Sequence, residues 1–168
     1  KLVSDMVNGE IVGTFKMVDI TQSVSHMVYQ SLPTLFNEEV KSPDSVYFSY
    51  EFEVANTQEA TDIFLPSLDI IERLNISGNL DSRDSSFVHT VTSNQLQYSN
   101  AIINNFSTEV LSDSGVLKAN ITSDKILFGD SLIFLNYQFF TKGVDNRFLF
   151  ETSFDNSLVK FINSNLDL

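Results

Sequence analysis

The stretch Ser45–Asn56, SVYFSYEFEVAN, decides the fold class of this chain. Apolar or aromatic residues occupy every second position from Val46 to Val54, and Tyr, Ser and Glu fill the positions between them. Side chains alternate between two faces along a β-strand, so this pattern gives the strand one apolar face and one polar face. A strand of that kind is typical of an antiparallel sheet that is covered on one side only.

Downstream of this stretch, the chain repeats the same kind of pattern between clusters of turn residues. The clusters are Asp81–Ser86 (DSRDSS), Ser112–Gly115 (SDSG) and Lys142–Asn146 (KGVDN), and an alternating run follows each of them. Residues 57–66 are compatible with a helical turn before Pro66. We therefore expect a mainly all-β chain whose long, twisted antiparallel sheet has about eight to ten strands.

Positions of like character recur along the sheet region at a spacing of 30 or 31 residues. Leu96, Tyr98 and Ile102 precede Ile126, Phe128 and Leu132 by 30 residues, and Leu117 and Ala119 precede Phe148 and Phe150 by 31. Asn105 and Asn136 are also 31 residues apart, and an aromatic residue follows each. Such a period indicates a repeated strand unit stacked along one axis, whereas chance similarity among alternating strands is the alternative.

The N-terminal part of the chain shows two different periods. Residues 9–19 alternate as a strand does, and the following residues change to helical spacing, with Val24, Met27, Val28 and Leu32 on one face. Thr21 is the expected N-cap, and Pro33 ends the helix, which predicts a helix over residues 21–32. Residues 1–44 are thus a strand-plus-helix entry segment, and residues 45–168 are a repetitive amphipathic sheet in the same domain.

Composition excludes several classes of function. The chain has 168 residues and a formal net charge of -12, so nucleic acids and anionic membranes would repel it. Cysteine is absent, which excludes disulfides, thiol nucleophiles and cysteine-based zinc sites. The chain begins at Lys1 rather than Met, and we interpret it as a fragment of a longer protein. The apolar run Leu132–Leu135 is much shorter than the ~20 residues of a membrane span.

No pattern in the sequence indicates catalysis, a metal or a cofactor. The chain lacks the G-x-S-x-G elbow, the H-E-x-x-H zinc motif, the calcium loop and the glycine-rich nucleotide loops. His26 and His89 are expected to be structural. Glu51 and Glu53 project from one strand face and could act as glycosidase acids, but a solvated sheet face explains them better. We expect that the protein is not an enzyme.

A large apolar face is the feature that remains, and it needs a partner. The expected face comprises Val46, Phe48, Tyr50, Phe52, Val54, Leu96, Tyr98, Leu117, Ile121, Ile126, Phe128, Phe148 and Phe150. A second sheet could pack on it as in a sandwich, the helix of residues 21–32 could cover part of it, or it could curl into a trough for acyl chains. The repeat favours the open, extended arrangement.

Several segments, taken in order, resemble the TamB family of translocation and assembly module subunits, in its Bacteroidota form. They are Asn8–Phe15 (NGEIVGTF), the helix that ends in Leu32–Leu35 (LPTL), Phe64–Leu68 (FLPSL), Leu74–Gly78 (LNISG), Leu96–Asn100 (LQYSN) and Ser131–Tyr137 (SLIFLNY). The resemblance spans most of the chain, and its weight lies in the order and spacing of these segments.

The resemblance implies an AsmA-like, bridge-like lipid-transfer protein of the periplasm. Such proteins are long β-sheets curled into a half-pipe, or β-taco. They are anchored in the inner membrane and reach a TamA-like outer-membrane barrel protein. The family is linked to phospholipid transport between the two membranes and to outer-membrane protein assembly, and no family residue is catalytic. The apolar positions above would line the lipid groove, and the helix could plug it.

Two further expectations complete this interpretation. Exposed sheet edges in an excised segment can pair between copies, which predicts a dimer of the fragment. The alternative function is a cell-surface structural or adhesin-like β-sandwich or β-solenoid that binds protein or glycan. That alternative predicts a closed core and no lipid.

Overall fold

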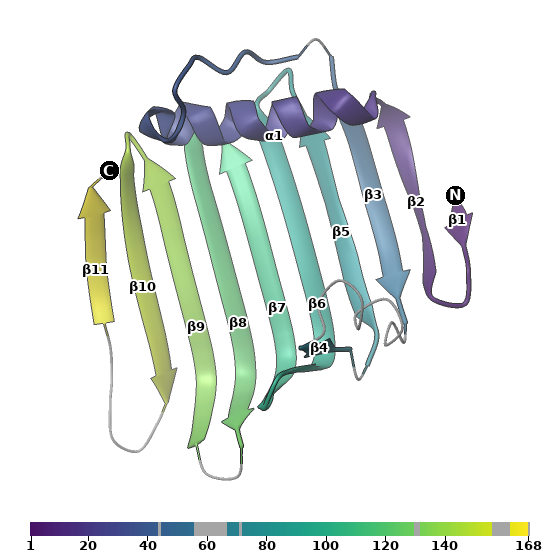
Figure 1. Cartoon of the computed structure of the whole chain (residues 1–168), viewed down its shortest axis with the longest axis vertical. Helices are drawn as coiled ribbons and strands as arrows, with labels where there is room; N and C mark the ends of the chain where they lie inside the picture. The colour runs from purple at the N-terminus through teal and green to yellow at the C-terminus, as the bar shows by residue number, and fades with distance from the viewer. Residues whose placement is uncertain (44, 56–66, 71, 130–131, 156–161, 168) are drawn as a thin grey trace.

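The fold is an open, single antiparallel sheet with one α-helix across one end of its strands (Figure 1). The structure is a computed structural model that describes residues 1–43, 45–55, 67–70, 72–129, 132–155 and 162–167. Its strands are β1 (Leu2–Val3), β2 (Val7–Thr14), β3 (Tyr47–Val54), β4 (Leu68–Asp69), β5 (Leu74–Asp81), β6 (Ser86–Tyr98), β7 (Ala101–Asp113), β8 (Val116–Phe128), β9 (Leu132–Val144), β10 (Arg147–Asp155) and β11 (Ile162–Asp167). The predicted all-β class, with one helix near the N-terminus, is confirmed.

The strands follow one another across the sheet almost in chain order. The order is β1-β2-β3-β5-β6-β7-β8-β9-β10-β11, and the short β4 pairs with the end of β6 outside this path. Every pairing is antiparallel, and no pairing joins the first strand to the last within the described residues. The sheet is therefore neither a closed barrel nor a sandwich in the part of the chain described.

Strand β3 confirms the alternation predicted for residues 45–56. Phe48, Tyr50 and Phe52 follow one another on one side, with ring centroids 5.8 Å and 6.2 Å apart. In the register, Phe48 pairs with Gly13 of β2 and Leu80 of β5. The strand is central in its pairings, and only its apolar side approaches the helix.

The turns at the helix end of the sheet have the chemistry that tight hairpins need. Ser114 and Gly115 join β7 to β8 with φ of 49° and 78°, and Asp145 and Asn146 join β9 to β10 with φ of 51° and 60°. Two consecutive positive φ angles are typical of the two-residue turns that match the twist of a hairpin. The clusters DSRDSS, SDSG and KGVDN all contain turns, as predicted.

The spacing of 30 to 31 residues corresponds to one hairpin of two long strands. Leu117 of β8 and Phe148 of β10 both pair with Gly143, so the two lie at the same level of the sheet. Asn105 and Asn136 share a left-handed backbone, with φ of 51° and 50°. Ile102 and Leu132 differ by one level, because Ile102 pairs with Leu127 and Leu132 pairs with Phe128.

Helix α1 spans Met17–Ser31, so the predicted start at Thr21 is wrong by one turn. The residue before it, Lys16, provides no side-chain cap, and Asp19 supplies favourable negative charge to the first turn. Met17 and Val18 are exposed, so the apolar period that comes from burial begins only further along the helix. The end is as predicted, because Pro33 opens a short 3-10 helix, Pro33–Leu35.

The predicted strand over residues 9–19 is shorter at its C-terminal end, because β2 ends at Thr14 and the helix already contains Met17. The predicted helical turn at residues 57–66 lies outside the described residues.

The core lies between α1 and the adjoining ends of the strands. Met27 packs there with Val46, Phe48 and Leu80, which are all buried. Ser23 and Ser31 lie one turn either side of Met27 and are also buried, since small side chains allow the helix to approach the sheet closely. Their hydroxyls donate to the carbonyls of Asp19 and Met27, four residues earlier in each case. Only this end of the sheet has a second layer among the described residues.

Candidate functional site: an uncharged sheet face

The register assigns one side of the sheet an unbroken set of uncharged residues, which we call the apolar face. Directly paired residues of antiparallel strands point to the same side, so the pairings define its rows. From the helix outwards the first three rows are Gly13, Phe48, Leu80, Phe87, Ser112, Leu117, Gly143, Phe148; then Ile11, Tyr50, Gly78, His89, Val110, Ala119, Thr141, Phe150; then Gly9, Phe52, Ile76, Val91, Thr108, Ile121, Phe139, Thr152. No Asp, Glu, Lys or Arg occurs in these rows. The fourth row is Val7, Val54, Leu74, Ser93, Phe106, Ser123 and Tyr137.

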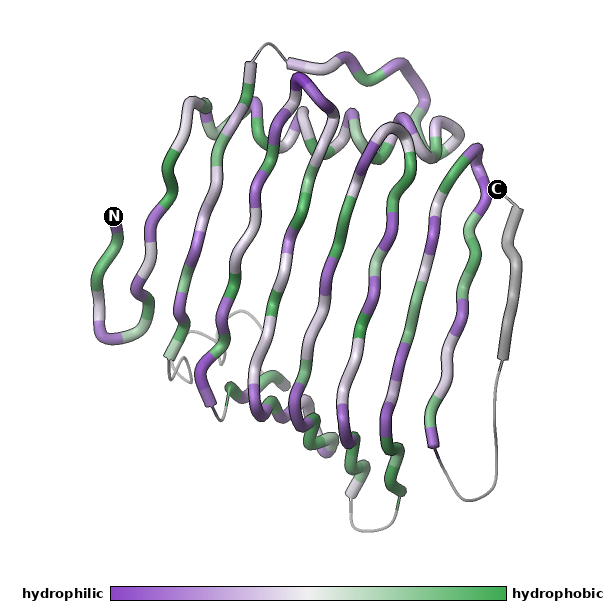
Figure 2. Tube along the Cα trace, turned by 180° about the vertical axis from the view of Figure 1, so that it is seen from behind, coloured by the Kyte–Doolittle hydropathy of each residue, from purple (hydrophilic) through white to green (hydrophobic). Residues whose placement is uncertain are grey.

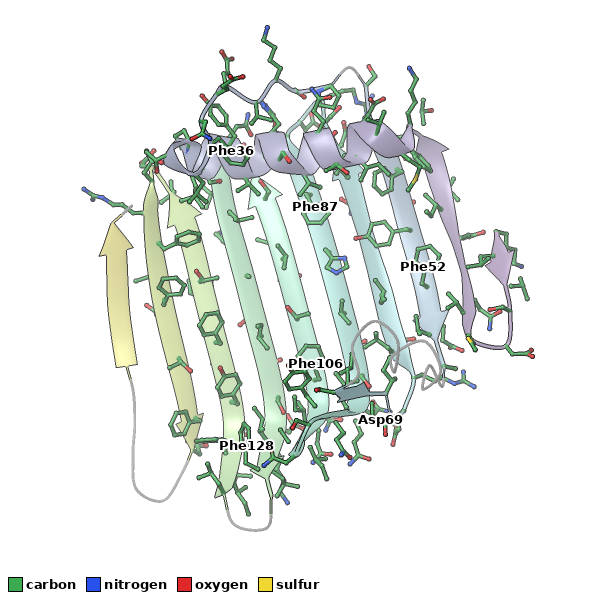
Figure 3. The ribbon with its side chains drawn as sticks, in the orientation of Figure 1. Phe36, Phe52, Asp69, Phe87, Phe106 and Phe128 are labelled. Carbon is green, nitrogen blue, oxygen red and sulfur yellow. The ribbon has the colours of Figure 1, made fainter. Side chains whose placement is uncertain are left out.

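The opposite face carries the charge of the sheet. Among its described residues are Glu10, Glu51, Glu53, Glu109, Lys118, Lys142 and Glu151. Phe52, Phe87 and Phe106 lie instead on the side that carries α1 (Figure 3). The hydropathy of the chain alternates along most strands for this reason (Figure 2). The sheet thus separates a charged surface from an uncharged one.

A transverse line of Asn and Asp residues bends the long strands near their far ends. The pairing ladder is interrupted where Asn105 faces Asp124, and where Asp124 faces Asn136. The Asn105 amide donates to Asp124 at 2.7 Å, and the Asn136 amide donates to Asp155 at 2.6 Å. Left-handed residues within a strand interrupt its alternation and redirect the side chains beyond them.

The apolar face continues beyond this bend. Phe134 lies past the bend, yet its ring is 4.7 Å from that of Phe154, with an edge-to-face geometry. Two more rows follow there: Leu96, Ile103, Ile126, Phe134, and then Tyr98, Ala101, Phe128, Leu132. The bend therefore keeps the even-numbered residues past it, such as Ile126, on the side of the odd-numbered residues before it, such as Ile121. The sequence signal for the bend was the pair Asn105 and Asn136, whose common spacing was visible but whose geometry was not.

The predicted lining residues all belong to this side, but their surroundings differ. Val46 and Phe48 are buried in the core beneath α1. Leu96 is buried at the far end of β6. Tyr98 and Phe128 are exposed. Partly buried positions on the uncovered part of the face are Tyr50, Phe52, Val54, Leu117, Ile121, Ile126, Phe148 and Phe150.

Aromatic rings form two groups on the apolar face. Near the N-terminal edge, Phe87 stacks on His89 with centroids 6.1 Å apart. Near the C-terminal edge, Phe150 lies 5.5 Å from Phe148 and 6.2 Å from Phe139. Sequence reasoning missed Phe139 and Phe134, because assigning their side requires the strand register.

One polar pair interrupts the apolar face. The hydroxyl of Tyr50 lies 2.5 Å from Nδ1 of His89, across Gly78 on the strand between them. Burial raises the pKa of Tyr50 and lowers the pKa of His89, so both side chains favour their neutral forms. The other histidine, His26, hydrogen-bonds the Val40 carbonyl at 2.6 Å and ties the following loop to the helix.

The charged face offers no comparable site. Two hollows of about 330 and 310 Å³ both include Glu10 and Glu51 in their lining. Glu53 forms an ion pair with Arg73 at 2.9 Å, which binds this carboxylate on the surface. No group of three metal-ligating side chains occurs in the described part of the chain. No helix among the described residues has the length and apolarity to cross a membrane.

Comparisons with protein family models, curated proteins and solved structures find no match to this chain.

Proposed function

We propose that this chain is a segment of a TamB-like periplasmic protein whose apolar face is a groove for phospholipid acyl chains. The observation that carries the proposal is the absence of any Asp, Glu, Lys or Arg from the apolar face, although the opposite face is charged. A contiguous apolar surface of this size requires a partner.

The physical advantage for a lipid is the transfer of its tails between apolar surroundings. Each CH₂ group kept out of water is worth ~0.8 kcal/mol, so two acyl chains gain strongly from a continuous lining. The long strands have 13 residues each, and a strand rises about 3.3 Å per residue, which gives the lining a length of roughly 40 Å. The headgroup would stay in water at the open side.

The rest of the proposed role follows from the same resemblance. The parent protein would be anchored in the inner membrane and would reach a TamA-like outer-membrane barrel protein. It would pass phospholipid between the membranes and support outer-membrane protein assembly. An adhesin-like sandwich would need a second sheet on the apolar face, and the described residues contain a single sheet.

Native mass spectrometry of the purified chain, with extraction of bound lipid, tests this proposal. We expect phospholipid at near-stoichiometric amounts with the wild-type chain. Phe150→Asp introduces a charge on the apolar face and should remove most of this lipid while the chain still folds. Leu149→Asp introduces the same charge one residue away on the opposite face, so it should leave lipid binding intact.

A lipid-free, compact wild-type monomer would contradict the proposal. Loss of folding in Phe150→Asp but not in Leu149→Asp would also contradict it, because a charge is unfavourable by several kcal/mol only where the face is already covered by protein.

A further inference from the structure

The far end of the β8–β9 hairpin, opposite the helix, is apolar on both of its sides. Tyr98, Phe128, Leu132, Ile133 and Leu135 expose between 39% and 56% of their surface there, and we call this group the apolar tip. Figure 2 shows the strand ends opposite the helix as hydrophobic. The adjoining turn residues 130–131 are outside the description and form no part of it.

The tip departs from the one-sided pattern of the rest of the sheet. Phe128 pairs with Leu132 on the apolar face, whereas Leu127 pairs with Ile133 on the other. Leu127 also pairs with Ile102 of β7, so the apolar character extends across the tip on the outer side. A sheet that only lined a groove would keep polar residues on that outer side, as it does nearer the helix.

The two ends of the sheet differ in a way that gives the face a direction. At one end α1 packs over the strand ends, with Met27 buried against Phe48 and Leu80. At the other end no helix covers the strands among the described residues, and the apolar face runs past the bend to Phe128 and Leu132. The face is therefore closed at the helix and open at the tip.

Charge restricts the partner that the tip can take. The chain has a formal net charge of -12, so a surface of negative lipid headgroups would repel it. Exposed Tyr and Phe beside Leu and Ile are the side chains that suit the boundary between headgroups and acyl chains. A neutral, zwitterionic bilayer fits both conditions.

We propose that the apolar tip inserts into the surface of a zwitterionic lipid bilayer and forms the mouth of the groove. This inference rests on the proposed function for its direction, since lipid would enter at the tip and stop at α1. Binding of the tip to a bilayer is nevertheless a separate property from lipid held along the sheet.

Flotation with phosphatidylcholine vesicles tests the inference. We expect the wild-type chain to float with these vesicles and to float at least several-fold less with phosphatidylglycerol vesicles. The double variant Ile133→Asp/Leu135→Asp should lose vesicle binding at least tenfold. The control is Val3→Asp/Val12→Asp, which adds the same charge at equally exposed apolar residues of the opposite edge and should float like wild type.

The outcomes separate the tip from the groove. Loss of flotation in the tip variant with lipid still bound along the sheet supports the inference, and so does flotation of a wild-type chain that carries no lipid, which would overturn only the proposed function. A wild-type chain that does not float overturns the inference. Equal losses in the tip and control variants overturn it as well, as does a dimer that only the tip variant dissociates.

The conservative double variant Ile133→Gln/Leu135→Gln provides a second reading where the charged variant fails to fold. It should retain the wild-type unfolding midpoint and lose several-fold in vesicle binding, and unchanged binding would overturn the inference.

Discussion

At the scale of single residues, glycine and aromatic side chains are matched across neighbouring strands. A Cβ at Gly78 would meet the side chain of Tyr50 and the carbonyl of Val88. The absence of that Cβ lets the Tyr50 ring cross the strand and reach His89. Gly143 is related to Phe148 in the same way, because a Cβ there would lie 3.2 Å from the Phe148 ring.

Gly78→Ala should therefore destabilise the protein by about 1–3 kcal/mol, since the Tyr50 ring or the backbone must move. Urea unfolding measures this change. Ser77→Ala alters the neighbouring residue on the opposite face, and its free energy of unfolding should stay within about 0.5 kcal/mol of wild type. Equal effects of the two substitutions would contradict the packing described for Gly78.

His89 makes stability depend on pH. Burial lowers its pKa in the folded protein, so the unfolded chain, with a pKa of about 6.5, binds the proton more readily. Stability from this group is complete above that pH and falls as the pH drops below it. Asp81, whose pKa is lowered to about 2 by Arg83, titrates below this window.

We expect His89→Gln to flatten the fall in the free energy of unfolding as the pH decreases through and below 6.5. Urea unfolding across this pH range provides the comparison with wild type. An identical slope in the two proteins would show that His89 is not the group responsible.

At the scale of elements, the helix contributes to stability through one side only. Met27 is 2% exposed and Met17 is 72% exposed, although both belong to α1. Met27→Ala should cost about 2–5 kcal/mol of unfolding free energy, because it opens a cavity against Phe48 and Leu80. Met17→Ala makes the same chemical change without a cavity and should be nearly neutral. Thermal unfolding of the two variants distinguishes a packed helix from a loosely attached one.

The sequence predicted these elements to the extent that burial imposes a period. The alternation of Val46 to Val54 predicted β3, and Pro33 predicted the end of the helix. The first turn of α1 was missed because Met17 and Val18 are exposed and follow no apolar period. The bend was missed because it depends on pairing between Asn105 and Asp124, and register cannot be obtained from one strand alone.

At the scale of the whole molecule, the strand register keeps charge on one side of a sheet that has one helix at one end. The candidate lining residues were predicted because the apolar pattern itself exposes them. Phe134 and Phe139 were not predicted, since only the register assigns them to the apolar face. Val46 and Phe48 were assigned to the lining because a strand pattern cannot tell which part of a face the helix covers.

The most direct test of the central claim compares two adjacent aromatic residues on β9. Phe139 lies on the apolar face, opposite Ile121, and Phe140 lies on the charged face, opposite Asn120 and Glu151. A photoreactive phenylalanine analogue at either position, illuminated in the presence of phospholipid, reports which face contacts acyl chains. The account predicts lipid adducts from position 139 and few or none from position 140. Equal lipid labelling at the two positions, or protein adducts alone from position 139, would contradict it.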